Sequence, residues 1–130
     1  MFNFRRREIP WEVVDNKSVN AIPMYYEDED LDIAVVGEAD TRGTYVFQVT
    51  SGKEAPSLRN AVEFARQQLL QEIIKKGYNI LLLESWQLTV FRRGKEHRIE
   101  VQYCGRPARA LGKLPARRPP PFMAVLENCH

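Results

Sequence analysis

Apolar residues recur every three or four positions between residues 57 and 76, which is the spacing of one face of an α-helix. The stripe consists of Leu58, Ala61, Val62, Ala65, Leu69 and Ile73. Ser57 can cap the first turn, and Gly77 follows two lysines, so both ends carry helix signals. We therefore predict one amphipathic helix from Ser57 to Lys76, with Phe64 on its polar side.

The segments 80–92 and 97–104 alternate between apolar and polar positions, which predicts a β-hairpin. A turn centred on Gly94 and Lys95 would place Arg93 opposite Glu96. The same register opposes three apolar pairs on one face, namely Val90 with Ile99, Leu88 with Val101 and Trp86 with Tyr103. A slip by one residue would turn all of these side chains to the other face, so the register is strongly specified.

An earlier hairpin is predicted from alternation in residues 31–35 and 45–49, because the stretch 38–43 between them is rich in turn formers. Pairing Val35 with Phe47 would bring the apolar sets of both segments onto one face. The segment from Val19 to Tyr26 is consistent with an edge strand, since Pro23 cannot donate to a central ladder.

These elements predict an α+β fold, an antiparallel sheet of four to five strands built from two β-hairpins and covered on one face by a single amphipathic helix. The expected order is (β)ββαββ. We expect an N-terminal arm over 1–16, an α+β domain over 17–105 and a Pro-rich basic C-terminal arm over 106–130. Glycines and prolines from Gly105 onward predict that regular structure stops there. The apolar group that begins at Phe122 favours docking of this arm on the domain or on a second subunit.

The length of 130 residues fits one domain, and no apolar run approaches the roughly 20 residues of a membrane span. Two cysteines are too few for a disulfide scaffold or a structural zinc site. We find no catalytic motif, no metal-ligand set and no cofactor-binding motif. The expected location is the cytoplasm or the nucleus, without membrane association.

Charge is unevenly distributed, with acidic residues concentrated between 27 and 40 and basic residues between 92 and 118. The basic side chains gather around the tip of the second hairpin and along the tail. Together with two aromatic residues they form the candidate binding set for protein or nucleic acid: Arg92, Arg93, Lys95, Arg98, Arg106, Arg109, Phe64 and Phe122.

Glu84 has the same strand parity as the apolar residues that we place facing the helix. A carboxylate in that position would be desolvated and would need a partner. A pocket near Glu84, Trp86 and Tyr103 is therefore an alternative site, although a structural role at a bulge or the sheet rim is the simpler explanation of Glu84.

The leading hypothesis is a non-catalytic protein-interaction module that self-associates through its sheet face and C-terminal arm. Its partner would be a second copy or another protein. One alternative is a nucleic-acid-binding protein that uses the basic hairpin tip and tail. The other is a small-ligand-binding protein or enzyme with a pocket near Glu84.

Overall fold

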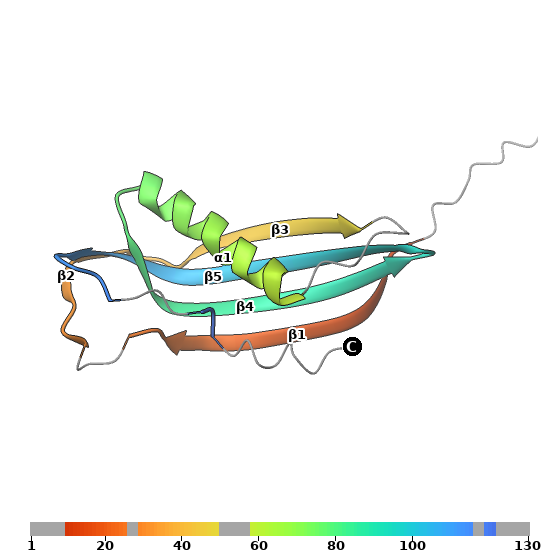
Figure 1. Cartoon of the computed structure of the whole chain (residues 1–130), viewed down its shortest axis with the longest axis horizontal. Helices are drawn as coiled ribbons and strands as arrows, with labels where there is room; N and C mark the ends of the chain where they lie inside the picture. The colour runs from red at the N-terminus through yellow and green to blue at the C-terminus, as the bar shows by residue number, and fades with distance from the viewer. Residues whose placement is uncertain (1–9, 26–28, 50–57, 116–118, 122–130) are drawn as a thin grey trace, which may run out of the picture.

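The computed structural model describes residues 10–25, 29–49, 58–115 and 119–121. One helix packs on an antiparallel five-stranded sheet, which confirms the predicted α+β class (Figure 1). The elements in chain order are β1 (Glu12–Pro23), β2 (Asp32–Val36), β3 (Thr41–Val49), α1 (Leu58–Lys75), β4 (Ile80–Arg93) and β5 (Glu96–Leu111).

The β4–β5 hairpin has the register that the alternation predicts. Arg93 lies opposite Glu96, and their side chains form an ion pair of 3.2 Å. The three apolar pairs are Val90 with Ile99, Leu88 with Val101 and Trp86 with Tyr103. Gly94 occupies the turn with a φ of 60°, a backbone conformation that side chains with a Cβ rarely adopt.

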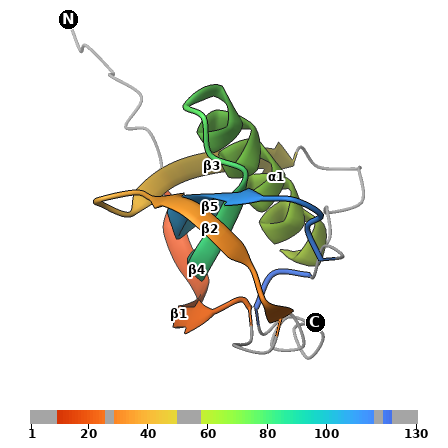
Figure 2. The ribbon, with the colours of Figure 1, turned by 90° about the vertical axis from the view of Figure 1, so that its left-hand side faces the viewer.

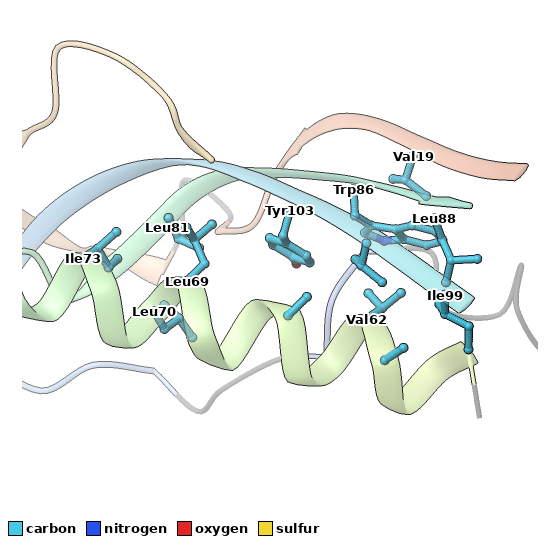
Figure 3. Close-up of a cluster of buried hydrophobic side chains, with 13 residues drawn as sticks. Val19, Val62, Leu69, Leu70, Ile73, Leu81, Trp86, Leu88, Ile99 and Tyr103 are labelled. Carbon is cyan, nitrogen blue, oxygen red and sulfur yellow. The ribbon is translucent and has the colours of Figure 1, made fainter. Parts of the chain in front are cut away.

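The core lies between this hairpin and α1, and Figure 3 shows Trp86, Leu88 and Tyr103 on the side of the sheet that faces the helix. The predicted helix stripe is confirmed, because its members from Ala61 to Ile73 are buried and Leu58 packs against the same cluster. Small residues at Ala61 and Ala65 allow the helix backbone to approach the strands. Ser57, the expected cap, lies outside the described residues.

The pairing predicted for the earlier hairpin is wrong. Both β2 and β3 run antiparallel to β5, β2 along residues 108–111 and β3 along residues 97–105. They therefore follow one another along the same edge of β5 and resemble one strand interrupted at residues 37–40. Val35 lies opposite Arg109, and Phe47 lies opposite Ile99. The interruption is held by Arg106, which donates to Asp40, Gly37 and Glu38.

Strand β5 continues through the residues that we expected to end it. A Cβ on Gly105 would lie 2.8 Å from Leu81 Cδ2, so the irregularity that β4 makes between Leu81 and Glu84 requires a glycine opposite it. Pro107 lies beside the same irregularity, and its carbonyl accepts a 2.7 Å bond from the Gly37 N–H. At the other end of the domain, β1 begins at Glu12, inside the range expected to be an arm.

Candidate functional site

A buried polar network lies between α1 and the sheet. Glu84 on β4 is fully buried, as its strand parity predicts, and Arg66 on α1 is 7% exposed. Arg66 donates to both Glu84 carboxylate oxygens, from Nε at 2.5 Å and from the terminal nitrogen at 2.9 Å. The Tyr103 hydroxyl on β5 donates to Oε1 at 2.5 Å. Helix and both hairpin strands therefore each supply one member.

The charges of this network are mutually stabilised. Burial alone would lower the pKa of Arg66, but the hydrogen bond and the negative charge of Glu84 outweigh it and raise the pKa above its ordinary value. Burial, and then the charge of Glu84, raise the pKa of Tyr103 well above 10.0. Glu84 is therefore held as an acceptor for two donors, an arrangement that joins α1 to the sheet.

Sequence reasoning identified Glu84 but missed Arg66. Arg66 follows Val62 by four residues and precedes Leu69 by three, so it lies within the apolar stripe. An arginine in the inward stripe of the helix and a glutamate in the inward register of the strand are complementary. That combination was the signal that could have paired them.

The C-terminal segment docks against the same side of the sheet. The indole N–H of Trp86 donates to the Pro121 carbonyl at 2.9 Å, and Pro120 and Pro121 are buried. A hollow of about 400 Å³ lies between this segment and α1, bordered by Phe64 and Arg66 among others. Glu84 is not part of its lining, and both Glu84 carboxylate oxygens are held by Arg66 and Tyr103. Trp86 and Tyr103 instead contribute to the lining of a hollow on the opposite face of the sheet. Phe122 lies outside the described residues.

The other face of the sheet is open and mostly polar. Ser18, Thr44, Gln87 and Gln102 form one row across four strands, and all four side chains are exposed. They contribute to a hollow of about 280 Å³ on this face. Because few apolar side chains lie here, the face offers little area for a hydrophobic interface.

Three of the six candidate basic residues form an ion pair with a carboxylate in the described part of the chain. Arg92 pairs with Glu12 at 3.7 Å, Arg93 pairs with Glu96, and Arg106 pairs with Asp40 at 2.7 Å. Exposed pairs of this kind contribute about 0–1 kcal/mol to stability, but they lower the net positive field of the hairpin tip. Lys95 is exposed in the turn before β5, and Arg109 is exposed near the opposite end of β5. These two residues therefore do not form one cluster.

Arg98 has a different environment. Its guanidinium carbon lies 4.8 Å from the ring centres of both Trp11 and Phe91. Arg93 lies 4.5 Å from the centre of the same Trp11 ring. Arg98 Nε is buried and has no hydrogen-bond partner among the described residues. The place of Trp11 in this stack of arginines and aromatic rings was not predicted, because Trp11 was assigned to an arm.

Phe64 lies on the exposed side of α1, as predicted, with 49% of its surface accessible. It contacts Phe47 of β3 edge to face, with ring centres 5.4 Å apart. Phe64 therefore links α1 to the outer strand of the sheet, and it also borders the hollow beside Pro119 and Pro120.

The two outer edges of the sheet differ in how they are protected. β1 contains Pro23, the charged residues Glu12, Asp15 and Lys17, and two register irregularities opposite β4. Prolines, charges and bulges are the usual devices that prevent an edge from pairing with another strand. β3 is nine residues long, contains no proline and carries one charged residue, Arg42. Its pairing with β5 is regular throughout, and no described strand pairs with its outer edge.

Comparison with protein-family models, with curated proteins and with solved structures yields no significant match to this chain. Within the described residues, no helix has both the length and the apolar character that crossing a membrane requires.

The ion pair between Arg66 and Glu84 is expected to dominate the response of this region to mutation. Arg66→Met should lower the free energy of unfolding by about 3–5 kcal/mol, because it leaves a buried carboxylate without a cation. Adding Glu84→Gln should reduce the cost to about 1–3 kcal/mol, since only neutral groups then lack partners. Urea unfolding measures both values.

The matched control is Arg59→Met on the same helix, where Arg59 pairs with Glu63 at 3.4 Å and both side chains are 43% exposed. That change should cost about 0–1 kcal/mol. An Arg66→Met cost as small as that of Arg59→Met would contradict the role assigned to the buried pair.

Tyr103 should make stability sensitive to alkaline pH. Because folding raises the pKa of Tyr103, its hydroxyl stabilises the fold fully below pH 10 and loses this effect as pH rises above 10. Tyr103→Phe should cost about 1–3 kcal/mol at pH 7. Above pH 10 the difference from the unmodified chain should shrink by about 1.4 kcal/mol per pH unit. Urea unfolding from pH 7 to 11 checks this, and a constant difference would refute it.

Proposed function

We propose that the chain is a non-catalytic interaction module that self-associates by pairing the outer edge of β3 with β3 of a second copy. The observation that carries the proposal is the contrast between the protected edge of β1 and the bare edge of β3. An unpaired edge exposes a row of backbone donors and acceptors, which another strand can satisfy. The polar open face supports the edge as the contact rather than the face.

Two-fold pairing suits the sequence of β3. If two antiparallel copies are centred on Tyr45, Arg42 lies opposite Gln48 of the other copy, so no like charges are opposed. Thr44 then lies opposite Val46, which places two β-branched residues together on the open face. The result would be one continuous sheet across both copies, with a helix on each half.

The test introduces one lysine into each edge strand, in two separate variants. Val46 on β3 is 52% exposed and Val13 on β1 is 59% exposed, so Val46→Lys and Val13→Lys introduce the same charge at equally accessible positions. We expect Val46→Lys to raise the dimer dissociation constant at least tenfold, because it places a lysine of each copy diagonally across the paired edges, where the like charges repel. Val13→Lys should leave it unchanged. Light scattering after size-exclusion chromatography, over a concentration series, provides the measurement.

Two outcomes count against this function. The unmodified chain could remain a monomer up to millimolar concentration, or both lysine variants could weaken association equally. Removal of residues 106–130 is not a suitable test, because β5 extends to Leu111 and would lose the residues that pair with β2.

A second candidate is binding of single-stranded nucleic acid at the hairpin tip, and the Trp11–Arg98–Phe91 stack favours it. Aromatic rings and arginines side by side provide stacking and phosphate contacts. Arg98→Met should then abolish salt-sensitive binding of a fluorescent oligonucleotide, whereas Arg59→Met on α1 should not. Absence of binding at low salt, measured by fluorescence anisotropy, would eliminate this candidate.

A further inference from the structure

The strongest candidate beyond the β3 edge is the place where the C-terminal prolines dock. We define the proline seat as Trp86 of β4 together with Asn60, Phe64, Arg66 and Gln67 of α1. Pro120 and Pro121 are buried there, whereas Pro119 is exposed. The hollow of about 400 Å³ beside Pro119 and Pro120 shows that the seat is wider than the segment that fills it.

The chemistry of the seat suits a proline-rich segment. Trp86 is 2% exposed, so its indole N–H needs an acceptor, and the Pro121 carbonyl provides one at 2.9 Å. Consecutive prolines adopt the polyproline II conformation, which has no internal hydrogen bonds and leaves its carbonyls available. Such a segment is already ordered before it binds, so docking costs little conformational entropy.

The prolines lie where the helix cannot cover the sheet. Figure 2 shows α1 beside β3 and β5, with β1 on the far side. Trp86 pairs with Tyr103 on one side and with Val19 of β1 on the other, and all three side chains belong to the buried core. Without the proline segment, the Trp86 indole N–H would lose the acceptor that the Pro121 carbonyl provides.

We propose that the proline seat is a recognition site for the segment Pro119–Pro121 as a separable ligand, and that it takes this segment from a second copy when its own is unseated. Each copy carries both halves of the contact, which is the condition for exchange of an identical element between protomers. This goes beyond the pairing of β3 and does not depend on it. Because the segment and the seat belong to one chain, the effective concentration of a chain's own segment at its seat is on the order of a millimolar, so the intramolecular contact prevails in an isolated copy.

The experiment presents the segment as a synthetic peptide of residues 113–124 that carries a spin label at its C-terminus. The acceptor is the ¹⁵N-labelled full chain with Pro119, Pro120 and Pro121 changed to Ala and with Val46→Lys added, so that edge pairing cannot contribute. We expect saturable broadening of the Trp86 indole resonance. Trp11 is an internal control, because its partner Arg93 is seven strand residues from Trp86, about 23 Å away.

A second arm uses the chain with its own prolines intact and only Val46→Lys. There the apparent affinity for the peptide should fall about 10- to 100-fold, because the tethered segment competes. This arm needs no change near Trp86, so the proposal stays testable if the alanine variant does not fold. A peptide in which the three prolines are alanine should bind neither chain.

Three results would overturn the proposal. The first is no broadening of Trp86 at millimolar peptide in either chain. The second is equal binding of the proline and alanine peptides, which would show that the proline seat does not discriminate proline from alanine. The third is tighter binding of an unrelated decaproline peptide, which would assign the seat to another protein rather than to a second copy. None of these results depends on the β3 edge, which Val46→Lys has already blocked.

Discussion

The antiparallel pairing of β4 with β5 determines where the buried groups of this domain lie. The register that opposes Trp86 with Tyr103 also brings Glu84 to the same face, within reach of the Tyr103 hydroxyl. β5 then carries β2 and β3 along its other side, so one strand organises both halves of the sheet. A slip of one residue between β4 and β5 would send Glu84 and Trp86 to the open face, and both the polar network and the proline seat would be lost.

A single helix is too narrow for this sheet. Four adjacent strands at about 4.8 Å spacing are wider than the roughly 10 Å diameter of α1, so part of the inner face is left over. α1 packs on β3, β5 and β4. Two further contacts are made on the inner face of the sheet. Arg66 reaches from the helix to neutralise Glu84, and Pro121, which is buried like Pro120, accepts the hydrogen bond of the Trp86 indole.

The sequence predicted those parts of the fold in which the partners are close along the chain. The β4–β5 register follows from a short turn and alternating side chains, and α1 follows from its own periodicity. Alternation in residues 31–35 and 45–49 indicates which side chains share a face, but it does not identify the partner strand. Both segments pair with β5 instead. The irregularity between Ile33 and Val35 also interrupts the strict alternation of side chains on which the predicted pairing relied.

The candidate site was only partly predictable for a related reason. Glu84 stands out because it is a charged residue at a position of its strand where the other residues on the same face are apolar, and this is a local signal. Its partner Arg66 lies 18 residues earlier, on another element, and the seating of Pro121 on Trp86 spans 35 residues. Contacts between elements depend on how wide the sheet is and where the helix crosses it. Neither quantity is encoded in the pattern of any one segment.

The different character of the β1 and β3 edges is related to where α1 packs on the sheet. α1 packs on β3, β5 and β4 rather than on β1. The charges, the proline and the irregular pairing of β1 protect its edge from another strand. β3 has α1 against its inner face through Phe47 and Phe64, and this support keeps a long, regular and nearly uncharged edge in place. An edge that is both straight and rigid loses little entropy when a second strand pairs with it. The self-pairing proposed for β3 would use the backbone groups of its edge, whereas the proline segment proposed as a ligand of the region around Trp86 needs no backbone ladder.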